Sequence, residues 1–159
     1  MCFWKGPLEE LARHLQDTHD VIQIDRDKQV KFLWTPPIET SSRVRYRILN
    51  MALQSAYPTP FILEHCYNAT TRNVVFLVRS LNQDFKYRYC ISLMNRFDSS
   101  NFLSFDGETV SFEDYGDILQ DVDDHKKCFS IPYTVLKDYV FYNEEDDDKY
   151  FSLIVEFKL

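Results

Sequence analysis

Apolar residues recur at helical spacing near the start of the chain, at Leu8, Leu11, Ala12 and Leu15. Pro7 suits a first helical turn, where a missing N–H costs nothing, and Glu9 and Glu10 suit the positive end of a helix. The pattern predicts a short helix that begins at Pro7 and ends near His19.

Beyond this segment, short β-forming runs replace the helical spacing, and turn residues separate them. Val44, Tyr46 and Ile48 alternate with arginines, which is typical of a strand with one apolar and one basic face. Residues 74–78 are continuously apolar and fit a strand covered on both faces. Strands are predicted at residues 29–34, 43–53, 60–67, 73–81, 85–97, 101–105, 109–112, 127–131 and 150–158.

Many strands, few helices and no βαβ alternation predict a mainly β protein built as an antiparallel β-sandwich and preceded by a short helix. Residues 112–120 and 132–140 are predicted to form short helices or turns between strands. The acidic run 143–149 is typical of a solvated hairpin loop and lacks the alternating spacing of a calcium loop. The only candidate seam between domains lies at residues 20–28.

Composition narrows the possible functions. The 159 residues include only three glycines, too few for a dinucleotide-binding turn, a P-loop or a nucleophile elbow. The formal net charge of -7 disfavours nucleic acid and anionic membranes as partners, which leaves proteins as the expected partners.

Neither a long apolar run nor the apolar core of a signal peptide is present in the sequence, so we expect a cytoplasmic or nuclear protein. The four cysteines are widely spaced, and none forms a C-x-x-C pair. In a reducing compartment we therefore expect free thiols rather than a disulfide scaffold.

The sharpest chemical signal is a candidate metal site at Cys2, His14 and His19. The spacing Cys-x11-His-x4-His resembles the closing half of a Cys2His2 zinc site, because thiolate and neutral imidazole are ligands that zinc prefers. A fourth ligand would come from a cysteine upstream of Cys2. The alternatives are a site that has lost its metal, or two surface histidines on an amphipathic helix.

Other polar groups give weaker signals. His65 and Cys66 could belong to a Cys/His nucleophile or to a second metal site with His125 and Cys128. Neighbouring residues on a strand point to opposite faces, however, so a core thiol and a hydrogen-bonded core histidine are the favoured interpretation. Cys90 is likewise expected in the core.

The start of the chain carries a longer pattern made of Cys2, Trp4, Gly6, Leu8, His14, Leu15, His19, Val21, Ile22, Val30, Phe32 and Leu33. This pattern resembles the signature of the seven in absentia (Siah/Sina) family of RING-type ubiquitin ligases, whose second zinc finger has the same interval between its ligands. Segments 60–63, 74–78, 87–93 and 129–132 follow in a plausible order for the family's β-sandwich.

The resemblance implies two regions. Residues 1–20 would be the C-terminal part of a zinc finger, with zinc held by Cys2, His14 and His19. Residues 21–159 would be a TRAF-like substrate-binding β-sandwich. The implied function is the substrate- or adaptor-recognition region of a Siah-like RING ubiquitin ligase, with no catalytic residue of its own.

The sequence contains no RING cysteine array, so an E2 enzyme is an expected partner only if a RING lies upstream. The alternative function is a RING-less adaptor or competitor that binds proteins without ubiquitin ligation. A carbohydrate-binding or hydrolytic sandwich is an alternative of a different class, and a hydrolase of that kind would need two carboxyl groups facing each other across a cleft.

The resemblance also implies a site for extended peptides in partner proteins and a homodimer. The expected peptide-binding residues are Ile24, Val30, Phe32, Val44, Arg45, Tyr46 and Ile48. Arg45 and Arg47 replace the acidic character of the family's strand and should favour acidic neighbours of the bound motif.

The expected dimer interface lies on the last strand, at Leu153, Ile154 and Val155, because this long strand is predicted to leave an edge or face bare. The alternative is a monomer in which Leu153 and Val155 face their own core and Ile154 is exposed.

Overall fold

The computed structural model describes residues 6, 8–19, 21–24, 29–36, 44–51, 59–81, 86–95, 97–112, 127–145 and 148–158. In this part of the chain a helix, α1 (Leu8–Thr18), precedes a series of strands. The strands are β1 (Val21–Ile24), β2 (Gln29–Trp34), β3 (Arg45–Met51), β4 (Thr59–Asn68), β5 (Asn73–Ser80), β6 (Arg88–Met94), β7 (Phe102–Glu108), β8 (Val110–Ser111), β9 (Cys128–Pro132), β10 (Val140–Asn143) and β11 (Asp148–Lys158). A short helix, α2 (Tyr133–Leu136), and a 3-10 turn, η2 (Lys137–Tyr139), separate β9 from β10.

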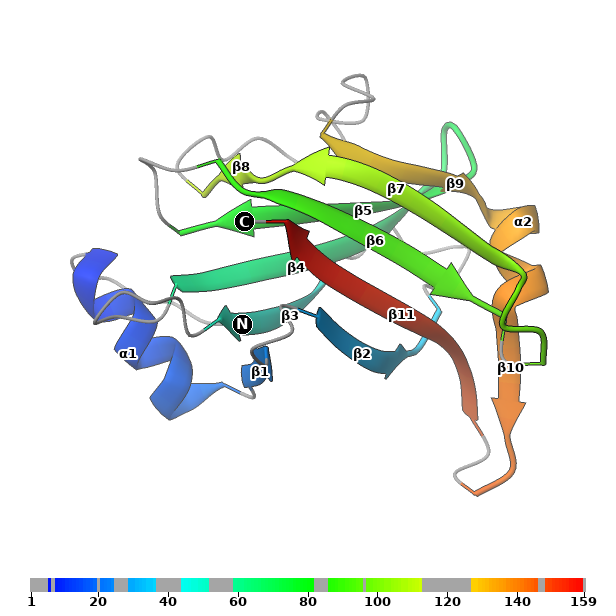
Figure 1. Cartoon of the computed structure of the whole chain (residues 1–159), viewed down its shortest axis with the longest axis horizontal. Coiled ribbons are helices and arrows are strands. Elements are labelled where there is room, and N and C mark those ends of the chain that lie inside the picture. The colour runs from blue at the N-terminus through cyan, green and yellow to red at the C-terminus, as the bar shows by residue number, and fades with distance from the viewer. Residues whose placement is uncertain are drawn as a thin grey trace.

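The strands form two sheets that lie face to face (Figure 1). The first has the order β1-β3-β4-β5-β8, and β9 also pairs with β5. The second has the order β10-β11-β6-β7, and β2 also pairs with β11. Most pairs are antiparallel, but β1 runs parallel to β3 and β8 runs parallel to β5. A mainly β, two-layered fold with a short helix is confirmed, and the sheets are mixed rather than purely antiparallel.

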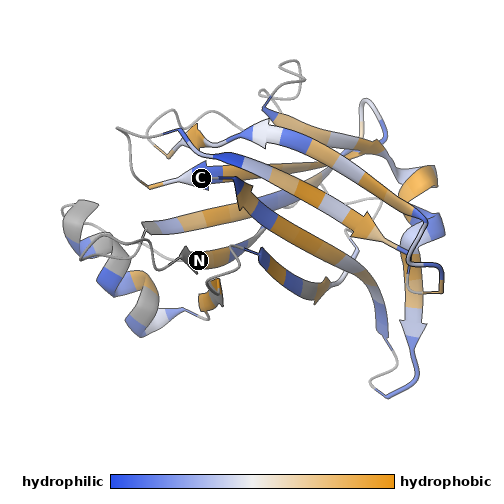
Figure 2. Ribbon diagram, viewed as in Figure 1, coloured by the Kyte–Doolittle hydropathy of each residue, from blue (hydrophilic) through white to orange (hydrophobic). Residues whose placement is uncertain are grey.

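The main core fills the space between the two sheets. Strand β11 shows the alternation that builds it, because Phe151, Leu153, Val155 and Phe157 are buried while Glu156 and Lys158 are exposed. Hydrophobic and hydrophilic positions alternate along the front strands in the same way (Figure 2). Burying a large apolar side chain contributes about 1.5–3 kcal/mol, so these rows hold the sheets together.

A second apolar layer covers the far face of the first sheet. Leu15 of α1 packs there with Ile48, Ile62 and Leu81. On the same face, Val75 and Leu77 of β5 pack in a separate cluster with Cys66, Val110 and Cys128. Strand β5 is thus buried on both faces, which explains why residues 74–78 are continuously apolar. Among the described residues, no helix is long and apolar enough to span a membrane.

Two strands were not predicted. β1 is only four residues long, which is too short for its local pattern to predict a strand. It is held in the sheet by its pairing with β3, which is distant in sequence. Val140, the first residue of β10, falls in the segment 132–140 that the sequence predicts as a short helix or turn, because it continues the helical spacing of Val135 and Leu136. Pairing with β11 instead draws residue 140 into the sheet. The other predicted helical segment is 112–120, and Phe112 is its only described residue.

Candidate functional site

The two predicted histidine ligands lie side by side at the end of α1. The ring centroids of His14 and His19 are 5.5 Å apart, with the rings nearly perpendicular. The amide of His19 donates to the carbonyl of Leu15 at 3.0 Å, which places His19 on the last turn of the helix. The helix therefore brings together two histidines that are five positions apart.

This pair fits two ligands of one zinc ion. Two imidazoles on a tetrahedral zinc, with Zn–N near 2.1 Å, would have ring centroids about 5 Å apart. Nε2 of His19 is buried and has no hydrogen-bond partner among the described residues. Nδ1 of His14 lies 3.3 Å from Oγ1 of Thr18, a contact that can orient the ring.

Cys2, the third predicted ligand, lies outside the described residues. Within the described ranges, no cluster of three or more histidine, cysteine, aspartate or glutamate side chains is placed to hold a metal ion. The described part of the site therefore consists of the two imidazoles.

The expected peptide-binding residues do not share one face. Ile24 and Val30 lie in the core between the sheets, and Ile48 lies beneath α1. Val44 is 38% exposed. The side chains of Phe32 and Tyr46 lie outside the described residues, although both backbones pair within the sheets. Among the described side chains of this set, Ile24, Val30 and Ile48 are buried, Arg45 is half-buried and Val44 is exposed.

Arg45 and Arg47 lie on the face of β3 that looks toward the second sheet, where they reach the end of β2. Nη1 of Arg45 donates to Oγ1 of Thr35 at 2.5 Å and to the carbonyls of Thr35 and Pro36 at 3.5 Å. The guanidinium of Arg47 lies 6.0 Å from the ring of Trp34, within range of a cation–π contact. We call residues Trp34, Thr35, Arg45 and Arg47 the basic edge.

Residues 45–47 of the basic edge have a strand partner on one side only among the described residues. Residues 45–47 pair with β4 on one side, and β1 covers only residues 48–51 on the other side. Among the described strands, β2 pairs with β11. Such an edge can accept an extended chain as an additional strand.

His65 lies behind the basic edge, opposite Arg45 in the sheet register. It is fully buried, and neither ring nitrogen has a hydrogen-bond partner among the described residues. Burial, with a smaller contribution from the charges of Arg45 and Arg47, lowers the pKa of His65 to about 3. His65 therefore lies in the core as predicted, but the expected hydrogen bond to its ring is not found among the described residues. Cys66 faces the opposite side of the sheet, as predicted, and is a buried thiol that forms no disulfide.

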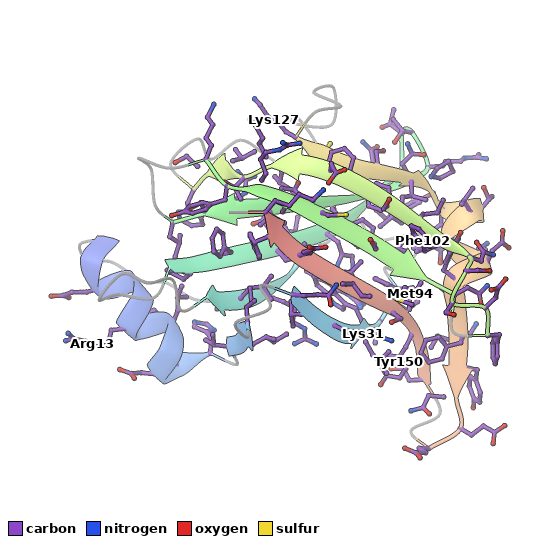
Figure 3. All side chains as sticks on the ribbon, in the orientation of Figure 1. Arg13, Lys31, Met94, Phe102, Lys127 and Tyr150 are labelled. Atoms are coloured by element: carbon purple, nitrogen blue, oxygen red, sulfur yellow. The ribbon has the colours of Figure 1, made fainter. Side chains whose placement is uncertain are left out.

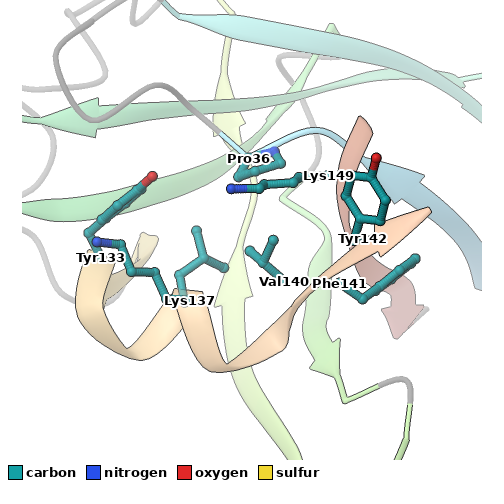
Figure 4. A pocket seen from close by; sticks show the side chains of 8 residues that line it. Pro36, Tyr133, Lys137, Val140, Phe141, Tyr142 and Lys149 are labelled. Atoms are coloured by element: carbon teal, nitrogen blue, oxygen red, sulfur yellow. The ribbon is translucent and has the colours of Figure 1, made fainter. Parts of the chain in front are cut away.

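A pocket of about 360 Å³ lies beside Pro36, where the chain leaves β2 (Figure 4). We call it the end pocket. Its lining residues are Pro36, Tyr133, Leu136, Lys137, Val140, Phe141, Tyr142 and Lys149. Nζ of Lys137 lies 4.8 Å from the centre of the Tyr133 ring. The sequence did not indicate this pocket, because its residues come from β2, α2, η2, β10 and β11, and only the fold brings them together.

The predicted dimer residues divide between the two faces of β11. Leu153 and Val155 are fully buried in the core between the sheets, and β11 has strand neighbours on both edges. The expectation of a bare edge on the last strand is therefore wrong. Ile154 lies on the outer face and is partly exposed. It shares this face with Leu33, Met94 and Phe102, of which Met94 and Phe102 can be followed in Figure 3.

Comparisons with known proteins do not assign this chain to a family. No protein-family model matches the chain, and no curated protein matches its sequence.

Proposed function

We propose that this chain is a protein-recognition module that binds extended segments of partner proteins at the basic edge. By its resemblance to the seven in absentia family, it would serve as the substrate- or adaptor-recognition region of a ubiquitin ligase. The observation that carries the proposal is the basic edge itself, where residues 45–47 of β3 have only one strand partner among the described residues and lie beside two arginines and a tryptophan.

The chemistry of the edge suits a binding module. An added strand would gain main-chain hydrogen bonds, and side chains beside the edge would select among sequences. Arginine and tryptophan are enriched among the residues that dominate binding energy at protein interfaces, because both offer a large contact area together with polar groups. None of the described residues that line the end pocket is a carboxylate.

Zinc would have a structural role in this proposal. His14 and His19 would hold it, with Cys2 as the third ligand, and ligation would fix the end of α1. Because α1 packs through Leu15 against the first sheet, the metal would stabilise the helix on that face, away from the basic edge. Ubiquitin transfer would additionally need a RING that recruits an E2 enzyme. A RING-less adaptor would use the same edge.

Selection from a displayed library of intracellular peptides, with the purified chain as bait, tests the proposal. Enriched peptides are then measured by fluorescence anisotropy against wild type and against the double variant Val44→Asp with Arg47→Ala. We expect the double variant to bind at least about tenfold more weakly, a change of about 1.4 kcal/mol.

The matched control is Arg88→Ala with Phe97→Asp, because both residues are exposed and lie on the second sheet or its turn. This variant should bind as wild type does. A library from which no peptide is enriched, or equal binding by both double variants, would contradict the proposal.

A further inference from the structure

The imidazole of His65 is a buried polar group with aromatic surroundings. Phe76 of β5 and Phe151 of β11 pack against it, and Trp34 of β2 lies nearest, with its ring centroid 4.0 Å away. His65 is fully buried, and neither of its ring nitrogens has a hydrogen-bond partner among the described residues. Protonation in this position is costly, because the charge loses its hydration and gains no hydrogen bond.

The charged groups that face His65 are both cations. Arg45 lies opposite it in the register of β3 and β4, and Arg47 lies two residues further on the same face. From β2, β5 and β11 the facing side chains are the three aromatic rings, which do not titrate. Glu64, the neighbouring acid on β4, points to the opposite face and pairs there with Arg79. A proton on His65 would therefore meet two positive charges and no carboxylate among the described residues.

The end of β2 is the part of this enclosure that can move most easily. Among the described strands β2 has a partner on one edge, whereas β4, β5 and β11 have partners on both edges. Trp34 is the last residue of β2, and Arg45 and Arg47 hold this end through Thr35 and the indole. Displacing Trp34 would hydrate the imidazole, whereas displacing a central strand would open the whole core.

We infer that the Trp34 end of β2 is an acid-opened latch on the basic edge, in which a protonated His65 and a closed edge exclude each other. Acid moves Trp34 and Thr35 away from β3, water reaches the imidazole, and the edge loses the tryptophan beneath Arg47. By the same linkage, a segment bound across the closed edge keeps His65 neutral. This inference rests on the proposed function and adds its regulation by pH.

The open latch binds more protons than the closed one. Burial and the charges of Arg45 and Arg47 lower the pKa of His65 from 6.5 to about 3 in the closed form, and hydration in the open form restores the ordinary value. Opening therefore becomes more favourable as the pH falls from 6.5 toward 3. From pH 7 to pH 5, the ratio of open to closed latch should rise about 25-fold.

Native-state amide hydrogen exchange of the wild type at pH 7, 6 and 5, corrected for the intrinsic exchange rate, measures this opening. We expect the amides of β2 to be at least about tenfold less protected than those of β4 and β5, since they exchange through a local opening. Their protection should fall about 25-fold from pH 7 to pH 5. Protection of β2 equal to that of β4 and β5, or unchanged over this pH range, would overturn the inference.

Two controls show whether His65 is the titrating group. His65→Leu should remove the pH dependence of β2, and an equal fall in this variant would overturn the inference. If the variant does not fold, wild-type β7 decides, because it has one strand partner among the described strands, as β2 does, and contributes none of the rings around His65. Amides of β7 that exchange locally should change within about twofold, and an equal fall there would show a general effect of acid instead.

A peptide enriched from the displayed library tests the link to the basic edge. At pH 7 and about a hundred times its Kd, the peptide should raise the protection of β2 about a hundredfold and leave locally exchanging amides of β7 unchanged. If the peptide binds and the protection of β2 does not change, the proposed function stands and the latch inference is wrong. If no peptide is enriched, the proposed function fails and the inferred regulation fails with it.

Discussion

The imidazole of His65 meets the indole of Trp34 edge to face, with the two ring centroids 4.0 Å apart. Phe76 and Phe151 lie on other sides of the same imidazole, with ring centroids at 5.7 and 6.1 Å. A protonated imidazole in this aromatic enclosure would lose its hydration without gaining a carboxylate partner. The neutral ring is therefore the folded form, and it supports Trp34 from beneath the basic edge.

Acid should destabilise the fold through His65. Its folded pKa of about 3 is below the model value of 6.5, so between these values the unfolded chain binds more protons. Stability is then highest above pH 6.5 and decreases as the pH falls toward 3, by about 2 kcal/mol between pH 7 and pH 5. Urea unfolding across this range measures the decrease.

The variant His65→Leu provides the comparison for that measurement. It removes the titrating group and keeps an apolar side chain of similar volume, so it should flatten the pH dependence whatever its effect on stability at pH 7. The same slope in wild type and His65→Leu would show that His65 does not titrate in this way.

A buried ion pair on the far face of the first sheet should be a weak point of the fold. Nε of Arg79 donates to Oε2 of Glu64 at 2.9 Å, and the two side chains are 1% and 13% exposed. Glu64→Gln removes one charged partner of a buried arginine and should cost about 3 kcal/mol. The double variant Glu64→Leu with Arg79→Met removes both charges and should recover most of this loss. A single variant within about 1 kcal/mol of wild type in urea unfolding would contradict the prediction.

Metal binding at the start of the chain should be weak and should depend on both histidines. Cobalt substitution reports it, because a tetrahedral site gives visible d–d bands and a thiolate ligand adds a charge-transfer band. We expect partial occupancy in wild type, loss of the bands in His19→Ala, and loss of the charge-transfer band in Cys2→Ser. Cys90→Ser, which removes a partly exposed free thiol elsewhere, is the control. Bands that persist in His19→Ala would remove the zinc assignment.

The fold could be predicted because its signals are local. Residues 29–34 form a strand with the predicted bounds, and the continuously apolar run at 74–78 lies in a strand that is covered on both faces. β1 and β10 could not be predicted, since each is only four residues long and depends on pairing with another strand. β1 pairs with β3, and β10 pairs with β11. The parallel pairing of β8 with β5 likewise has no local signal.

The site was harder to predict from the sequence. The alternation of residues along a strand shows which side chains share a face, but not what packs against that face. Arg45 and Arg47 were correctly placed on the face opposite Ile48, yet that face looks toward β2 and Ile48 lies beneath a helix. Trp34 and Pro36 carry no motif of their own. Their importance follows only from the meeting of β2 with β3 and with the segment around Lys137.

Self-association should occur through the outer face of the second sheet. Leu33 and Phe102 are 48% and 55% exposed there, and they lie at opposite ends of one register row that also holds Met94. Ile154 lies in the next row, between Lys31 and Ser92. An apolar patch at the centre of a flat sheet can pair with its own copy about a two-fold axis, because the same residues then meet on both sides.

Light scattering at micromolar concentration tests this dimer. Substitutions on the outer face of the second sheet are compared with a substitution at Val44, on a different exposed surface. Wild type should have twice the monomer mass, and Ile154→Asp with Phe102→Ser should have the monomer mass, because a buried unpaired carboxylate opposes association. Val44→Ser, at the other exposed edge, should remain dimeric. Leu153 and Val155 make no contribution beyond folding, since both are fully buried within the subunit. A wild type of monomer mass would end the dimer hypothesis, and a dimer that survives the double substitution would place its interface on another surface.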